Sequence, residues 1–229
     1  SGTHPGPFGM AAHGRDCVAV LDALGTEKGV LIGHSMGAYV ATRAAADAPH
    51  RTTGLVLVDG GLPLALPDGT DPDTAIDALV GPAVARLALT WAGREELEAF
   101  WKAHPALGEW TTWHDAYVAY DVESDPDGAL RSRVSETAVR HDGAELFTDP
   151  DSGRRVLGSD TPCWMLRAPR GLRDDPAAPL LGQDAIDTLK AARPDVEIVE
   201  LPPEVNHYSI VLGDTGARAV ATAVREAIT

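Results

Sequence analysis

The sequence is poor in basic residues. Over 229 residues, 19 Lys and Arg stand against 34 Asp and Glu, which gives a formal net charge of −15. Nucleic-acid binding requires a basic surface, and anionic membranes also attract basic segments, so this charge argues against both kinds of partner. The acidity itself is more typical of a solubility feature than of a binding surface. We therefore expect a small-molecule substrate, no nucleic-acid partner and no membrane partner.

Cysteines, cofactor motifs and long apolar runs are also scarce. Cys17 and Cys163 lie far apart and are expected to be free thiols, and no CxxC pair or His/Cys cluster suggests a metal site. No G-x-G-x-x-G follows a strand, so no dinucleotide cofactor is expected. No apolar run approaches the roughly 18 residues of a membrane helix, and the first residues show no signal peptide. These absences favour a cytoplasmic protein without cofactor or metal.

Short apolar runs alternate with helical patterns in both ends of the chain. Buried strands are predicted over 30–33, 54–58, 164–166 and 196–201. Helical spacing of apolar residues predicts helices over 11–24, 35–48, 183–192 and 214–228. Continuous apolar strands separated by helices are typical of an α/β fold, in which a mostly parallel sheet is covered by helices on both faces.

The pattern changes between residues 62 and 158. Helices are predicted there over 73–90, 94–103, 113–122 and 129–138, without a buried strand. The segment also holds four of the five tryptophans, Trp91, Trp101, Trp110 and Trp113, together with Tyr117 and Tyr120. Most such aromatics form a core, and one or two are expected to line a pocket. We expect residues 62–158 to be a helical cap inserted into a core formed by residues 1–61 and 159–229.

One short motif carries most of the functional information. Gly33-His34-Ser35-Met36-Gly37 is a G-x-S-x-G sequence between a predicted strand and a predicted helix, the context of a nucleophile elbow. In such a turn the serine has a strained backbone, and Gly33 and Gly37 are expected to relieve crowding around it. Ser35 is thus the candidate nucleophile, and the Met36 backbone N–H a candidate oxyanion-hole donor. His34 occupies the variable position and is expected to be structural.

With this motif the sequence resembles capped serine hydrolases of the α/β-hydrolase superfamily, of the kind found in actinobacteria, over essentially its whole length. The resemblance implies a catalytic triad in the chain order nucleophile, acid, histidine. Of the eight histidines, His207 alone lies in a loop between a late strand and the last helix. It is therefore the candidate general base.

The acid of the triad has two candidates. In most of the superfamily it follows the strand that corresponds here to residues 164–166, in a G-x-x-D context. Gly171 and Asp174 fit that spacing but come about three residues late. Asp59 directly follows the apolar run 54–58, where a subset of the superfamily places its acid. We favour Asp59, with Asp174 as the alternative.

The resemblance also implies several strands and a helix before residue 11, including a loop that supplies the second oxyanion-hole donor. The sequence begins in what resembles the loop upstream of the helix at 11–24. We therefore expect an N-terminally incomplete fold, with a missing segment or a second chain completing it.

Three classes of function remain open. The first is a serine hydrolase that cleaves an ester, thioester or lactone of a neutral, moderately apolar substrate through an acyl-enzyme. The second uses the same triad as an amide hydrolase, a carbon–carbon bond hydrolase or a perhydrolase. The third is a non-catalytic member of the fold that binds a small molecule.

Overall fold

The computed structural model describes residues 6–64 and 69–229, without the side chains of residues 80 and 82. Its centre is a parallel sheet with the strand order β1-β2-β6-β7. These strands are β1 (Gly29–His34), β2 (Thr52–Val58), β6 (Cys163–Arg167) and β7 (Glu197–Glu200). All four coincide with the predicted apolar runs to within two residues at each end.

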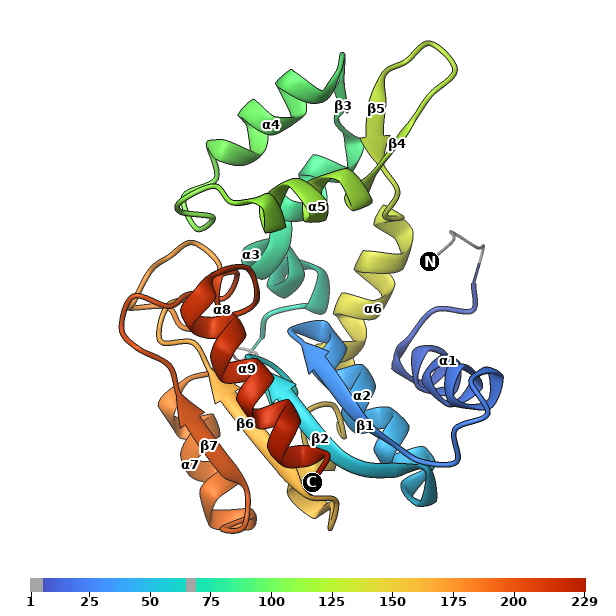
Figure 1. The fold of residues 1–229 in the computed structure, drawn as a ribbon, viewed down its shortest axis with the longest axis vertical. Coiled ribbons are helices and arrows are strands. Elements are labelled where there is room, and N and C mark those ends of the chain that lie inside the picture. Colours follow the sequence, from blue (N-terminus) through green and yellow to red (C-terminus); the bar gives the residue numbers. More distant parts are fainter. Residues whose placement is uncertain (1–5, 65–68) are drawn as a thin grey trace.

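Helices bury both faces of the sheet, which is why its strands are apolar throughout. On one face Leu55 and Leu57 pack with α2 (Met36–Asp47) and α7 (Gln183–Ala192). On the other, Val56 and Val58 pack with α8 (Ser209–Leu212) and α9 (Asp214–Ala227). The helix α1 (Met10–Ala23) packs against α2 (Figure 1). The predicted α/β class, a parallel sheet covered on both faces, is confirmed.

The described residues of the 62–158 segment contribute no strand to the central sheet. Their helices are α3 (Pro72–Ala85), α4 (Arg94–Lys102), α5 (Thr112–Asp121) and α6 (Glu136–Thr148). A small antiparallel sheet of order β3-β5-β4 accompanies them, formed by β3 (Thr90–Trp91), β4 (Val122–Ser124) and β5 (Leu130–Ser132). Figure 1 shows α3, α4, α5 and this small sheet above the end of the central sheet where β1, β2 and β6 terminate.

The predicted helix over 129–138 is wrong. Residues 125–128 (Asp-Pro-Asp-Gly) form a tight turn in which Gly128 has φ 89° and donates its N–H to the Asp125 carbonyl. This turn folds β5 back onto β4, so Leu130–Ser132 is extended. Helix α6 begins only after Ser135, whose side chain caps it by accepting the Ala138 N–H. A Pro-Asp-Gly turn signal thus outweighed the helical spacing.

Three further expectations concern the two cysteines, membrane-spanning helices and additional strands of the sheet. Cys17 and Cys163 are free, and burial raises the pKa of Cys163 to about 12. In the described part of the chain no helix has the length and apolar character needed to cross a membrane. There too, β1 pairs only with β2, and Ile32 on it is 51% exposed. Additional strands beyond β1 stay a prediction.

Candidate active site

Ser35 lies in a sharp turn between β1 and α2. Its backbone has φ 55° and ψ −125°. Residues other than glycine rarely adopt this conformation, which costs about 1–3 kcal/mol. The Ser35 N–H donates to the Val58 carbonyl at 2.9 Å, which fixes the turn against the end of β2. The strained elbow predicted from the motif is present in the fold.

Two glycines allow the backbone segments of the elbow to approach each other. A Cβ at Gly33 would lie 2.1 Å from the Gly37 carbonyl oxygen, so no side chain fits there. A Cβ at Gly37 would meet nothing within 4 Å outside its own helix turn, so the prediction that Gly37 relieves crowding is wrong. Gly60 has that function instead, because a Cβ there would lie 2.3 Å from the Ser35 carbonyl oxygen. No motif marked Gly60 in the sequence.

Met36 is the first residue of α2. The first N–H groups of a helix have no carbonyl partner within it, and the helix dipole places partial positive charge at this end. The Met36 N–H is therefore free of helical pairing directly beside the serine.

His207 pairs with Asp59 at the ends of the strands. His207 Nδ1 lies 2.7 Å from Asp59 Oδ2, and both residues are buried, with exposed fractions of 2% and 0%. The other carboxylate oxygen of Asp59 accepts the Ala168 N–H at 3.2 Å. Asp59 directly follows β2, and His207 lies in the loop between β7 and α8. The structure therefore brings together two residues that are 148 positions apart in the sequence.

Asp174 lies in a different environment. Its carboxylate accepts hydrogen bonds from Arg170 Nε at 2.7 Å and from Asn206 Nδ2 at 3.0 Å. The Arg170 guanidinium holds the pKa of Asp174 below its ordinary value. Among the described residues no hydrogen bond joins Asp174 to His207. Of the two candidate acids, the structure thus places Asp59 against the histidine.

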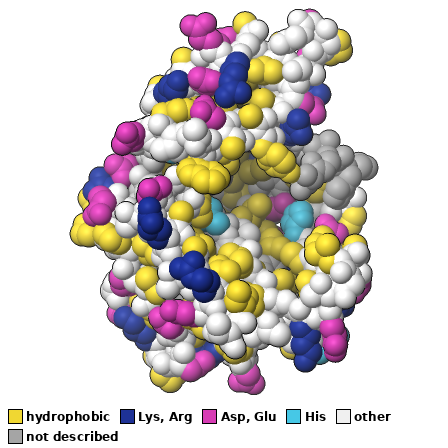
Figure 2. Space-filling view, viewed as in Figure 1, with side chains coloured by type: hydrophobic (Ala, Val, Ile, Leu, Met, Phe, Trp, Pro, Cys, Tyr) yellow, Lys and Arg dark blue, Asp and Glu magenta, His cyan; other side chains and the backbone are white. Residues whose placement is uncertain are grey.

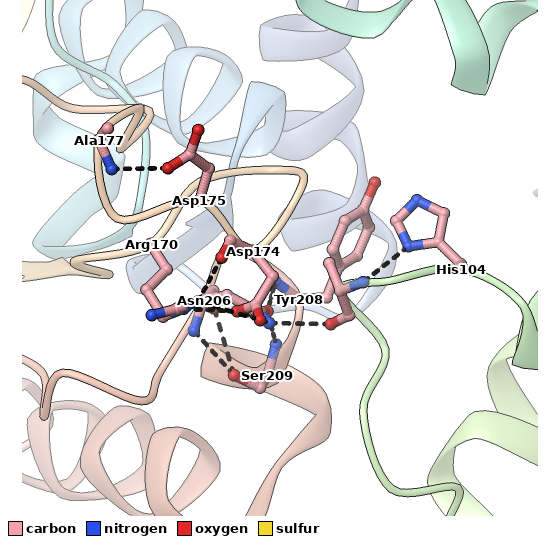
Figure 3. A network of polar contacts seen from close by, with 9 residues as sticks. His104, Arg170, Asp174, Asp175, Ala177, Asn206, Tyr208 and Ser209 are labelled. Carbon is pink, nitrogen blue, oxygen red and sulfur yellow. Dashed lines mark hydrogen bonds and ion pairs between the residues drawn. The ribbon is translucent and has the colours of Figure 1, made fainter.

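Asn206, next to His207, ties the histidine loop to two other segments (Figure 3). This buried side chain donates through Nδ2 to Asp174 and, at 2.9 Å, to the Ala106 carbonyl in the 62–158 segment. Its Oδ1 accepts the backbone N–H groups of Tyr208 and Ser209, both at 2.9 Å. All of its ordinary hydrogen-bonding capacity is used. No motif marked Asn206 in the sequence.

Backbone strain is concentrated among the candidate residues. In residues 6–64 and 69–229, the non-glycine residues with positive φ are Ser35, Asp59 and Asp174, with φ of 55°, 45° and 61°. Aspartate adopts this left-handed region more readily than most residues, whereas serine does so less often. Strained conformations persist where the surrounding structure enforces them, and they cluster at functional sites.

His34 packs against His207 rather than against Ser35. The ring centroids are 4.6 Å apart, and His34 Nε2 hydrogen-bonds to the His207 carbonyl oxygen at 2.8 Å. Burial, followed by the charge of His207, lowers the pKa of His34 to about 4. His34 is therefore neutral near pH 7, where its ring N–H can donate to that carbonyl and hold the histidine loop.

Ser35, the remaining residue of the candidate triad, is not hydrogen-bonded to the other two. Within the described parts of the chain no hydrogen bond joins Ser35 to His207. The Nδ1 contact with Asp59 leaves Nε2 on the opposite edge of the imidazole ring. Catalytic hydrogen bonds are often long in free enzymes and shorten when substrate binds, so this geometry fits an unliganded site.

A cavity of about 210 Å³ adjoins the elbow. Ser35 and Met36 lie on one wall, while α3 and α6 supply most of the remainder through residues such as Ile76, Leu79 and Phe147. Arg86 is the one charged residue among its described lining residues. Figure 2 shows a hollow in the middle of the face turned toward the viewer, bordered by hydrophobic and histidine side chains.

The expectation that one or two of the aromatic residues between 91 and 120 line a pocket is wrong for this cavity. None of the aromatic residues between 91 and 120 lines it. Trp91 and Trp101 are 3% and 5% exposed and form a separate core with Leu97, while Trp113 is 65% exposed. Side chains of α3 and α6, two helices that pack against each other, line the cavity together with Ser35 and Met36 instead.

The chain matches a known protein family over nearly its whole length. The family model described as "Alpha/beta hydrolase family" matches residues 1–223. The chain belongs to that family. A Klebsiella pneumoniae (strain 342) protein named "Putative carbamate hydrolase RutD" is 34% identical over 64 residues, which are 28% of this chain and 24% of the relative.

Two solved structures have the same fold as this chain. E-2-(acetamidomethylene)succinate hydrolase superposes with a TM-score of 0.72 at 20% identity, covering 97% of this chain and 75% of its own. The thioesterase domain from the curacin biosynthetic pathway gives 0.65 at 16% identity, covering 97% and 74%. At such identities the likeness shows the fold and does not determine the activity.

Proposed function

We propose that this family member is a serine hydrolase that cleaves an ester, thioester or lactone of a neutral, moderately apolar substrate. One observation carries the proposal: a buried Asp59–His207 hydrogen bond of 2.7 Å lies beside an elbow serine that opens into an apolar cavity. Nucleophile, base and orienting acid are the minimum that acyl transfer to a serine requires.

In the proposed mechanism His207 Nε2 takes the proton of Ser35 as Oγ attacks the substrate carbonyl. Asp59 holds Nδ1 protonated and stabilises the imidazolium that forms. The Met36 N–H donates to the oxyanion of the tetrahedral intermediate. His207 then returns its proton to the leaving group, and water, activated by the same histidine, hydrolyses the acyl-enzyme.

We also propose that residues 62–158 act as a cap that binds the acyl group, while residues 1–61 and 159–229 carry the triad. Apart from Ser35 and Met36, the cavity lining is largely apolar and comes mainly from α3 and α6 of that segment. A largely apolar lining favours a hydrocarbon-rich acyl group, because it cannot replace the water around a charged one.

A second candidate is cleavage of an amide or carbon–carbon bond, or perhydrolysis, by the same triad. The name of the Klebsiella relative, a carbamate hydrolase, favours a carbon–nitrogen bond within this alternative. A non-catalytic member of the fold would not need the buried Asp59–His207 pair beside a strained serine, whose backbone strain is unfavourable for stability.

Active-site labelling tests the proposal. A fluorophosphonate phosphonylates, with loss of fluoride, only a serine whose proton is accepted by a neighbouring base. We expect stoichiometric labelling of the folded protein, with the adduct on the peptide that contains Ser35. Heat-denatured protein is the control. An unlabelled Ser35 in folded protein would point to the non-catalytic alternative.

The cavity lining gives a second test. Phe147→Ala enlarges the cavity beside α6, so longer p-nitrophenyl esters are expected to gain in kcat/KM relative to short ones. Each additional buried methylene contributes about 0.8 kcal/mol, which corresponds to about a fourfold change. Trp113→Ala is the matched control, because this exposed residue does not line the cavity. An unchanged chain-length profile in Phe147→Ala would place the acyl group elsewhere.

A further inference from the structure

The apolar cavity beside Ser35 contains one cationic group. Arg86 follows α3 and is 9% exposed, although arginine is rarely buried to this extent without full pairing. It is the one charged residue among the described residues that line the cavity. A buried cation in a largely apolar wall is unfavourable unless its charge and its N–H groups are paired.

The internal partners of Arg86 hold its guanidinium but do not use it fully. One terminal nitrogen, Nη1, donates to Asp121 Oδ2, a carboxylate whose side chain is 9% exposed. The ring of Trp101 stacks on the guanidinium, with Cζ 4.7 Å from the ring centroid. Nε is buried and has no hydrogen-bond partner among the described residues. An arginine has five N–H donors, so donor capacity remains.

We propose that Arg86 is the polar specificity group of the cavity and that it binds an uncharged oxygen acceptor, a ketone carbonyl, on the acyl chain of the substrate. The inference rests on the proposed hydrolase function and adds to it a defined substrate class, oxoacyl esters. Asp121 already neutralises the guanidinium, so the pair as a whole offers N–H donors without net positive charge. A carboxylate-terminated acyl chain would meet the Asp121 carboxylate as well as Arg86 and would be repelled.

A neutral acceptor also fits the rest of the wall. The remaining lining offers little polar competition, since the hydroxyl of Tyr39 already donates to the Leu62 carbonyl at 2.6 Å. Ser35 and Met36 serve the ester group in the proposed mechanism. Among the other described lining residues, Arg86 is the one with N–H donors to spare for a ketone oxygen that has lost its water on entering the cavity. A hydrogen bond to a charged group in such a site is worth about a 10- to 100-fold difference in affinity.

Binding to the Ser35→Ala protein tests the proposal without requiring turnover. The ligands are methyl hexanoate, the methyl oxohexanoates with the ketone at C3, C4 or C5, and monomethyl adipate. Isothermal titration should show at least one oxohexanoate binding about 10- to 100-fold more tightly than methyl hexanoate. Monomethyl adipate should bind most weakly.

Two further variants, both made in the Ser35→Ala background, assign the effect to the guanidinium. Arg86→Met alone would leave Asp121 buried and unpaired and could unfold the protein, so it is combined with Asp121→Asn. This double change should abolish the preference for the ketone. Asp121→Asn alone keeps Arg86 and should make monomethyl adipate bind more tightly than in the Ser35→Ala parent.

The outcomes separate the alternatives. Equal affinity for all esters, or a preference that survives Arg86→Met/Asp121→Asn, would overturn the assignment and leave Arg86 a structural ion pair. Tightest binding of monomethyl adipate to Ser35→Ala would overturn the choice of an uncharged acceptor. A ketone preference in Ser35→Ala together with no hydrolysis by the native protein would instead contradict the proposed hydrolase function.

Discussion

Ser35→Ala is expected to abolish hydrolysis of a p-nitrophenyl ester, with kcat falling by a factor on the order of 10⁶. No other hydroxyl occupies the tip of the elbow, so a covalent acyl-enzyme cannot form. His207 and the Met36 N–H remain in place and can support only slow attack by water, which leaves a residual rate. Steady-state kinetics over a range of ester concentrations measures the effect. Activity within tenfold of the native protein would eliminate Ser35 as nucleophile.

The same substitution should leave the fold intact, which separates a catalytic effect from a structural one. Alanine keeps the Cβ, so the strain at φ 55° is unchanged, and no hydrogen bond of the Ser35 side chain within the described residues is lost. Ser35→Gly provides the matched control, because glycine adopts this conformation without penalty. It should be equally inactive but at least as resistant to thermal unfolding as the native protein. An inactive and unfolded Ser35→Ala protein would make the kinetic result uninformative, and Ser35→Gly would then decide.

Much of the fold was predictable from the sequence, because the strands of a sheet covered on both faces are continuous apolar runs. The run 54–58 illustrates this: helices cover alternate side chains on either face, so the period-2 pattern of a half-exposed strand is absent. The elbow was equally visible, since a strained serine between a strand and a helix requires glycine at Gly33.

The site was predictable only in part. Asp59 was favoured by its position after β2, and the structure places it against His207. Arg86 and Asn206 could not be found in the same way, because their importance depends on contacts across the fold. Arg86 follows a helix in an alanine- and leucine-rich stretch, where nothing distinguishes a buried arginine from a solvated one. Its burial arises from Trp101 and Asp121, which lie 15 and 35 residues further along the chain.

The tryptophans show the opposite error. Most of the aromatic residues between 91 and 120 were expected to form a core, and Trp91 and Trp101 do fill one between α4, α5 and the small sheet. The error lies in the one or two that were expected to line a pocket, because none of them lines the cavity beside Ser35. A segment far from the central sheet must bury its own apolar surface, and large aromatics do so efficiently. The cavity beside Ser35 is lined mainly by smaller aliphatic residues from α3 and α6, with Phe147 as the aromatic residue that α6 contributes.

Asp59→Asn is expected to lower kcat by about 10⁴-fold while the protein still folds. Asp59 accepts two N–H groups, one from Ala168 at 3.2 Å and one from His207 Nδ1 at 2.7 Å. Asparagine has one acceptor oxygen, so its amide N–H must face one of these donors. If it faces His207, the imidazole shifts its proton to Nε2 and can no longer accept the proton of Ser35. If it faces Ala168, a buried N–H is unpaired, at a cost of about 1–3 kcal/mol in stability.

Asp174→Asn is the control that decides between the two candidate acids. Both aspartates have positive φ, at 45° and 61°, and asparagine tolerates that backbone conformation equally well, so the two changes are matched in local strain. Asp174 bonds to Arg170 and Asn206 rather than to His207, so its replacement should keep kcat within about tenfold of the native value. Steady-state kinetics and thermal unfolding on both variants complete the comparison. A 10⁴-fold loss in Asp174→Asn with near-native activity in Asp59→Asn would move the acid to the loop after β6, because the histidine would then depend on a carboxylate that it does not contact in the free protein.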